Sequence, residues 1–301
     1  MADVFVVGSI NQDFVLSVES RPAPGQTVTD ARLATHNGGK GANQAAAAAL
    51  LGASVAFLGR VGDDGFGGPL VRSLADKGVD TSLVQEVPGS STGTAFITVT
   101  PDGENAITVA PGANRRLTAE DVDHASEWIQ EARVLVAQME IPPQAVLRAV
   151  EVAAGSGTRA LINLAPPFEV PRTLLEKLDP LVVNEHEAAF LLGESVEGVD
   201  GALSAAPELL SLGPRSVVVT VGDDGAVFSG GESAQHLTAP KVEVVDTTGA
   251  GDAFVGALAA RLADNAPLED AVAYAVRAGA AAVTKEGAQG ALPTPETVEA
   301  L

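Results

Sequence analysis

The sequence predicts an α/β fold: a doubly wound, mostly parallel central sheet flanked by helices, with a small β-sheet lid. Short runs rich in Val and Ile are apolar along nearly their whole length, as in strands covered on both faces. These runs alternate with Ala- and Leu-rich amphipathic stretches, the order that βαβ units give to a parallel sheet. Two further stretches interrupt this order with an alternation of period two, and they predict the lid.

The central sheet is predicted from the apolar runs, and its covering layers from the amphipathic stretches. The predicted strands are Val4–Val7, Val55–Leu58, Val134–Ala137, Leu161–Asn163, Leu181–Val183 and Val217–Thr220. The predicted helices are Gly41–Leu51, Phe66–Lys77, Ala119–Gln130, Pro143–Ala154, Glu185–Leu192, Leu203–Leu212, Gly249–Asp264 and Leu268–Thr284. No linker is long enough to separate independent domains, so residues 1–301 are expected to form one domain.

The lid is predicted from Thr27–Thr35 and from a pair of stretches, Ala95–Thr100 and Ala106–Val109. Pro101-Asp102-Gly103-Glu104 joins the pair and is a hairpin signal. We place the lid at about residues 14–35 and 94–110. Such a layer has few residues with which to cover its own apolar face. We therefore expect it to lie over a ligand cleft or against a second subunit.

Charge and composition exclude several classes of protein. The 301 residues include 18 Lys and Arg against 39 Asp and Glu, a formal net charge of −21. This charge argues against non-specific binding to nucleic acid or to an anionic membrane. The absence of cysteine excludes disulfides, thiolate catalysis and Cys-based zinc or iron–sulfur sites. The sequence shows neither a signal peptide nor an apolar run of membrane-spanning length, so we expect a cytoplasmic protein.

The strongest chemical signal is a run of small residues that opens a long apolar helix. Gly249 and Gly251 let the backbone approach a ligand closely, and the free amides of a helix start bind anions. Asp252 follows in the first turn, where its carboxylate can take a proton from a hydroxyl that attacks a held phosphoryl group. The alternative is that Asp246 or Thr248 caps the helix and Asp252 only complements the helix dipole.

Two other glycine-containing segments follow predicted strands. In the first, Asn11 and Asp13 come after the first strand, where ligands bind in open α/β sheets and where Asn and Asp also favour turns. In the second, glycines precede an Ala-rich helix whose first turn carries Lys40 and Asn43, placed to bind hydroxyls. This segment does not match the phosphate-binding Walker A pattern, and an ordinary glycine-rich loop is its alternative interpretation. Glu140 lies at another strand end.

Together, five segments resemble the PfkB family of carbohydrate kinases. They are Gly8–Asp13, Gly38–Gln44, Asn184–Glu187, Asp246–Asp252 and Thr284–Gln289, in the family's order and at its spacing. The resemblance spans essentially the whole chain, and the ordered set is far more specific than any one segment. It implies a central sheet with flanking helices and a β-sheet lid that also pairs two subunits. The implied reaction transfers the γ-phosphoryl group of ATP to the 5-hydroxyl of D-ribose.

The resemblance also implies roles for individual residues. Asp252 is the implied general base, and the amides of Gly249, Ala250 and Gly251 are the implied anion hole. The residues implied to hold the sugar are Asn11, Asp13, Gly39, Lys40, Asn43, Glu140 and Asp252. Those implied to line the ATP site are Asn184, Thr220, Gly222, Gly225 and Gly251, with Glu187 acting on Mg²⁺ through water. The implied site for a monovalent cation, usually K⁺, comprises Asp246, Thr248, Ala282, Lys285, Gly287 and the position of Ala291.

Two positions depart from the family pattern. Val276 stands where a His or Asn often lies beside the adenine, so that contact is expected to be apolar. Ala291 stands where a Ser can complete the cation site, which bears on cation affinity or selectivity. The acceptor also stays open between ribose and fructose, 2-deoxyribose or a nucleoside. A non-catalytic sugar or nucleotide sensor is a further alternative, against which the intact Gly249–Asp252 segment argues.

Overall fold

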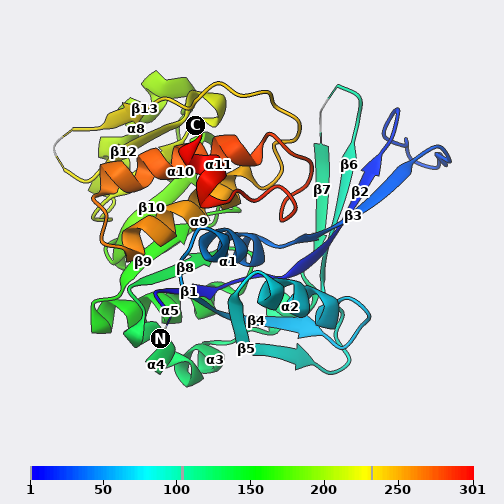
Figure 1. Cartoon of the computed structure of the whole chain (residues 1–301), viewed down its shortest axis with the longest axis horizontal. Coiled ribbons are helices and arrows are strands. Elements are labelled where there is room, and N and C mark those ends of the chain that lie inside the picture. Colours follow the sequence, from blue (N-terminus) through cyan, green and yellow to red (C-terminus); the bar gives the residue numbers. More distant parts are fainter. Residues whose placement is uncertain (1, 103–104, 232) are drawn as a thin grey trace.

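The computed structural model describes residues 2–102, 105–231 and 233–301, which form one large sheet, one small sheet and helices around the large one (Figure 1). The large sheet has the strand order β13-β12-β11-β10-β9-β8-β1-β4-β5. The strands from β11 to β5 run parallel, and β12 and β13 add an antiparallel edge. The predicted fold class is therefore confirmed.

The strands of the large sheet include every predicted one. Their bounds are β1 Val4–Val7, β4 Val55–Gly62, β5 Val79–Val87, β8 Val134–Gln138, β9 Arg159–Asn163, β10 Leu178–Asn184, β11 Val217–Thr220, β12 Ala226–Ser229 and β13 Gln235–Leu237. The strands that sequence reasoning missed, β5, β12 and β13, all lie at the edges. A long continuous apolar run marks a strand buried on both faces, and the part-exposed β5 and the short β12 and β13 lack one.

Helices cover both faces of the large sheet, and successive residues of a strand pack into different cores. Val4 and Val6 face one core, whereas Phe5 and Val7 face the other. The first core is covered by α1 Lys40–Leu50, α2 Gly67–Asp76, α9 Ala250–Ala263, α10 Leu268–Ala282 and α11 Pro295–Glu299. The second is covered by α3 Ala119–His124, α4 Ser126–Glu131, α5 Pro143–Ser156, α6 Arg172–Leu175, α7 Glu185–Leu192 and α8 Gly198–Ser211.

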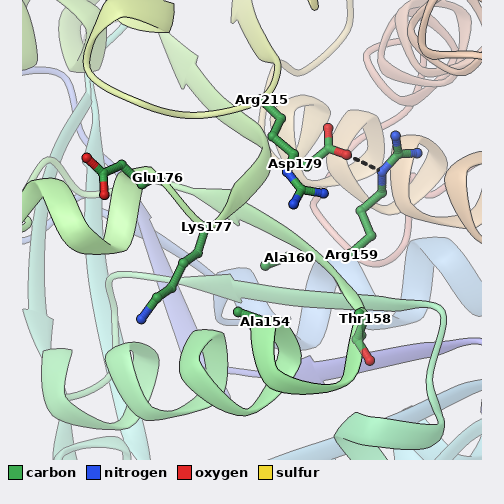
Figure 2. A pocket seen from close by; sticks show the side chains of 9 residues that line it. Ala154, Thr158, Arg159, Ala160, Glu176, Lys177, Asp179 and Arg215 are labelled. Atoms are coloured by element: carbon green, nitrogen blue, oxygen red, sulfur yellow. Dashed lines mark hydrogen bonds and ion pairs between the residues drawn. The ribbon is translucent and has the colours of Figure 1, made fainter.

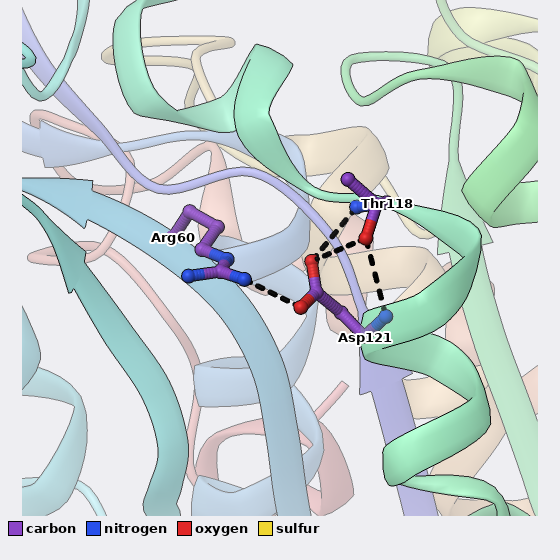
Figure 3. Close-up of polar contacts among 3 residues, drawn as sticks. All are labelled: Arg60, Thr118 and Asp121. Carbon is purple, nitrogen blue, oxygen red and sulfur yellow. Dashed lines mark hydrogen bonds and ion pairs between the residues drawn. The ribbon is translucent and has the colours of Figure 1, made fainter.

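The single helix predicted over Ala119–Gln130 is wrong, because the structure divides it at Ala125 into α3 and α4. A capping box between Thr118 and Asp121 begins α3, and the Arg60 side chain of β4 pairs with the same Asp121 carboxylate (Figure 3). This ion pair is largely shielded from solvent and ties the short helix to the central sheet. Within the described residues, no helix combines the length and the apolar character needed to cross a membrane.

The lid is a sheet of four strands that stands beside the large sheet (Figure 1). Its order is β3-β2-β6-β7, with bounds β2 Asn11–Ser17, β3 Arg32–Gly38, β6 Gly93–Val99 and β7 Asn105–Ala110. The predicted strand Thr27–Thr35 is wrong at its start, because residues 27–31 lie outside β3, beyond the proline-containing turn in which Gln26 N donates to Ala23 O. The predicted hairpin at Pro101–Glu104 includes Gly103 and Glu104, which lie outside the described residues.

Candidate active site

Asp252 lies where α1 and α9 meet, close to the ends of β1 and β8. Its side chain is only 7% exposed. The amide of Asn43 donates to Oδ2 at 2.8 Å, and the amide of Gln44 donates to Oδ1 at 3.0 Å. Gly256 permits this close approach of the helices, because a Cβ there would lie 2.6 Å from the Gln44 carbonyl oxygen. The carboxylate is therefore held by two side chains of α1.

The start of α9 presents free donors beside open space. Gly249 precedes the helix in a left-handed conformation with φ 78°, so neither Asp246 nor Thr248 is its N-cap. Among the described residues, the amides of Gly249 and Gly251 have no acceptor, whereas Ala250 N donates to the Thr247 carbonyl at 3.3 Å. A Cβ built on Gly251 would meet nothing within 4 Å. Free amides, open space and the helix dipole suit an anion at this point.

The residues predicted to hold a sugar converge around the start of β2 and the start of α1. Glu140 accepts hydrogen bonds from Ser9 Oγ at 2.6 Å and from Lys40 N at 3.1 Å. Asn11 Oδ1 accepts one from the Asn114 side chain at 2.7 Å. Gly39 has φ 88° and packs against the chain just before Asn11, so no side chain fits there. The structure thus brings these polar groups together at the base of the lid.

Asp13 is buried against Gly38, and its Oδ1 has no hydrogen-bond partner among the described residues. Burial raises the pKa of the Asp13 carboxyl from 3.8 to about 7, repulsion from Glu140 and Asp252 adds to this, and Lys40 opposes it. The pKa of Lys40 is raised, first by Asp252 and then by Glu140, against the effect of burial. Lys40 is therefore a cation among carboxylates, and Asp13 is left with an unsatisfied oxygen that a ligand hydroxyl can reach.

The residues predicted for the nucleotide cluster near the ends of β10 and β11, where Asn184 and Thr220 are register partners. Asn184 and Glu187 form a capping box for α7, in which the Glu187 carboxylate accepts from Asn184 N at 2.8 Å. Burial raises the pKa of Glu187, while the Asn184 amide and the charge of Lys40 act against it. Gly222 adjoins open space, but Gly225 is needed for the turn itself, because a Cβ there would lie within contact distance of the Leu237 carbonyl.

The residues predicted for a monovalent cation lie on two loops that Asp246 joins. Its carboxylate accepts from Thr248 N at 2.9 Å and from Gly287 N at 2.8 Å. These hydrogen bonds lower the pKa of Asp246 against the effect of its partial burial. In the parts of the chain that the structure describes, no three His, Asp or Glu side chains are grouped to hold a metal ion. One carboxylate with nearby carbonyls suits a monovalent cation better than a transition metal.

Two cavities lie apart from the polar groups around Asp252. One of about 290 Å³ adjoins Val276 on α10 and residues 237–240 after β12, and its lining is mainly apolar. The other, of about 260 Å³, lies at the opposite edge of the sheet and is lined by residues that include Arg159, Lys177 and Arg215 (Figure 2). Arg159 is paired with Asp179 at 2.9 Å. No predicted site residue lines this second cavity.

Sequence reasoning missed several polar residues of the site. Gln44, Gln138 and Asn163 form a buried hydrogen-bonded chain behind Asp252, and Asn114 orients Asn11. The available signal was weak: Gln138 and Asn163 are polar residues that each end an otherwise apolar strand. Nothing local in the sequence indicates that these two strand ends meet Gln44.

The fold and the site define a phosphotransferase: a buried carboxylate adjoins an open helix start, and a polar pocket of sugar-binding character lies beside them. The chain belongs to the PfkB family of carbohydrate kinases, whose family model matches residues 1–295. The predicted family is thus confirmed.

Named relatives cover nearly the whole chain. Ribokinase from Staphylococcus aureus (strain COL) is 39% identical over 300 residues, which are 98% of this chain and 98% of that protein. Deoxyribokinase from Salmonella typhi is 36% identical over 295 residues, 98% of this chain and 96% of that protein. The solved structure of Arabidopsis thaliana ribokinase complexed with ribose and ATP has a TM-score of 0.92 and 31% identity, covering 99% of this chain and 98% of that one.

Proposed function

We propose that this chain is a kinase that transfers the γ-phosphoryl group of ATP to the 5-hydroxyl of D-ribose, giving ribose 5-phosphate and ADP. The observation that carries this proposal is the position of Asp252, a buried carboxylate held by Asn43 and Gln44 beside the free amides of α9. Ribokinases that match nearly end to end, and the structure of one with ribose and ATP, support the substrate pair.

The proposed chemistry assigns one proton transfer to the protein. Asp252 accepts the proton of the 5-hydroxyl as this oxygen bonds to the γ-phosphorus, and the bond from that phosphorus to the β–γ bridging oxygen breaks. The electron pair of that bond leaves on ADP, and the proton on Asp252 later passes to water. The amides of Gly249, Ala250 and Gly251 stabilise charge on the moving phosphoryl group. Because Ala250 N is engaged with Thr247 in this structure, Gly249 and Gly251 are its ready donors.

The sugar is proposed to bind among the polar groups at the base of the lid: Asn11, Asp13, Gly39, Lys40, Asn43 and Glu140. This set has many hydrogen-bonding atoms and little apolar surface, which favours a small polyol over a nucleoside base. The deoxyribokinase relative makes 2-deoxyribose the most pointed alternative acceptor, and fructose and nucleosides are the others.

ATP is proposed to lie along Asn184, Thr220, Gly222, Gly225 and Gly251, with its adenine near the apolar side chain of Val276. Mg²⁺ bound to the phosphates neutralises charge, and Glu187 holds its water, a role that fits a buried, capping carboxylate. K⁺ is the proposed activator at Asp246 and the carbonyls of Thr248, Ala282, Lys285 and Gly287, with Ala291 in place of a hydroxyl ligand. A cytoplasmic location is proposed because the reaction needs ATP.

The lid is proposed to pair two copies of the chain. It exposes large apolar side chains on both of its faces: Leu33 is 60% exposed, Phe96 47% and Ile107 57%. Residues paired across strands share a face, so Asp13, Ala95 and Val109 lie on the face toward the sugar, and Phe14 and Phe96 on the other. A second copy would cover apolar surface that one subunit leaves in water.

The proposed function is tested by ADP release from Mg·ATP with ribose, 2-deoxyribose, fructose and a nucleoside. We expect ribose to give the highest kcat/KM, and a result with ribose as the poorest acceptor would reject the assignment. Asp252→Asn should fold and bind ATP but lose about 10²- to 10⁴-fold in kcat, the contribution of a general base. Binding of ribose and ATP by the unaltered protein without turnover would instead identify a sensor.

A further inference from the structure

A chain of buried amide side chains lies behind Asp252, on the side away from the sugar residues. Gln44 comes from α1, Gln138 ends β8 and Asn163 ends β9. Their exposed fractions are 1%, 0% and 9%. Buried amides are costly unless they are hydrogen-bonded, so the arrangement of this chain calls for an explanation.

The hydrogen bonds of this chain have a fixed direction. Gln138 Nε2 donates to Gln44 Oε1 at 2.6 Å, and Gln44 Nε2 donates to Asp252 Oδ1 and to Asn163 Oδ1, each at 3.0 Å. An amide has its acceptor on one side and its donors on the other. As long as Gln138 donates to Gln44, Gln44 must therefore turn its N–H groups toward Asp252. Asn163 favours the same direction, since its own N–H donates to the Val182 carbonyl at 3.4 Å.

We propose that Gln44 and Gln138 are positioning residues for the phosphoryl transfer, and that they orient the carboxylate of Asp252 toward the attacking hydroxyl. Gln44 holds Oδ1 while Asn43 holds Oδ2, so the carboxylate cannot rotate, and one lone pair of each oxygen stays free. Gln138 acts one step further away, because it decides which side of the Gln44 amide faces Asp252. This inference rests on the proposed function, since it requires Asp252 to be the base.

The sharpest test is Gln138→Glu, which replaces one NH₂ group by oxygen in a side chain of the same shape. The ionised carboxylate has no hydrogen to donate, so Gln44 turns its N–H groups toward it and its oxygen toward Asp252. We expect kcat to fall about 10- to 100-fold, the effect of losing a hydrogen bond to a charged group. The KM values for ribose and ATP should change less than about threefold, because neither substrate is proposed to touch residue 138.

The pH dependence separates positioning from a structural role. When the introduced carboxyl is protonated, it can donate to Gln44 and restore the original direction. The ratio of variant to unaltered kcat should therefore be near one at low pH and fall as pH rises. The charged groups around this region, Lys40 on α1, Asp252 on α9 and Glu140 after β8, are the same in both proteins, so their titration largely cancels in the ratio. A role confined to holding β8 against α1 predicts a constant ratio.

Two further variants keep the inference testable. Gln44→Glu places an acceptor directly against Asp252 and should lower kcat at least as much as Gln138→Glu does. Thr158→Val is the matched control: Thr158 is a buried polar side chain at the other end of the sheet, where its hydroxyl donates to the Ile129 carbonyl at 2.8 Å. This control should lower thermal stability and leave kcat unchanged.

Each outcome supports or overturns the inference. If Asp252→Asn is inactive while folded Gln138→Glu and Gln44→Glu keep full turnover at every pH, the positioning role is rejected and the proposed function stands. If Asp252→Asn itself keeps full turnover, the assignment of the base has failed. If neither glutamine variant can be obtained folded while Thr158→Val can, the amide chain serves folding, and the positioning role is again rejected.

Discussion

Replacing Asp13 by Asn is expected to stabilise the protein near pH 8 and, at the same time, to weaken ribose binding. The Asp13 carboxyl is buried, its Oδ1 has no hydrogen-bond partner among the described residues, and Glu140 and Asp252 repel its charge. An amide of the same shape removes the charge and supplies a donor. The unaltered protein is thus expected to sacrifice stability for a carboxylate that a sugar hydroxyl can satisfy.

The magnitude follows from the pKa, which is 3.8 for an ordinary Asp and about 7 for Asp13 in the folded protein. Because folding raises the pKa, the folded state binds the proton more tightly than the unfolded state does. The contribution to stability is therefore fully present below pH 3.8 and is lost as pH rises to about 7. At about 1.4 kcal/mol per pKa unit, the loss is about 4 kcal/mol. Asp13→Asn has no such loss.

The assay is urea unfolding of both proteins at a series of pH values from about 4 to 8, with the free energy of unfolding extrapolated to water. The free energy of Asp13→Asn minus that of the unaltered protein should increase by about 4 kcal/mol across this range. Asp30→Asn, at an exposed position of the lid segment, controls for the loss of one negative charge. A difference that stays constant with pH would show that Asp13 does not titrate in this range, and the reasoning from burial would be wrong.

Two further predictions concern the cation site and the lid. Turnover should be faster in KCl than in NaCl at equal ionic strength, and Asp246→Asn should remove this difference; equal rates in both salts for the unaltered protein would argue against the cation site. Phe96→Glu should shift a dimer to a monomer in sedimentation velocity, because it places a charge in the apolar surface proposed to join two lids, whereas an unchanged dimer would place the interface elsewhere.

The central sheet was predictable because its inner strands are buried on both faces, and so Val134–Gln138 and Val217–Thr220 carry a continuous apolar run. The lid strand Asn11–Ser17 was harder to place. It carries Asn and Asp at its start and becomes a strand by pairing with Arg32–Gly38 and with Gly93–Val99, which lies about eighty residues away in the chain. Local pattern cannot report such pairing.

The candidate site divides in the same way. Asp252 and Lys40 follow glycines at a helix start, a local pattern with a direct chemical meaning, and the structure places both near the predicted partners. Gln44 and Gln138 are joined across 94 positions of the chain by one hydrogen bond. Their contact depends on the packing of α1 against β8, so no spacing in the sequence announces it.

A chain with a net charge of −21 must still attract a nucleotide that is itself an anion. The site resolves this conflict locally rather than by reversing the charge of the surface. Lys40 is the cation nearest the reacting groups, and its pKa is raised by carboxylates that offset much of its charge, Asp252 foremost. The binding of phosphate then falls to uncharged dipoles, the amides at the start of α9, which act at short range. Such donors keep their strength whatever the total charge, and so an acidic protein can carry this chemistry without a basic patch.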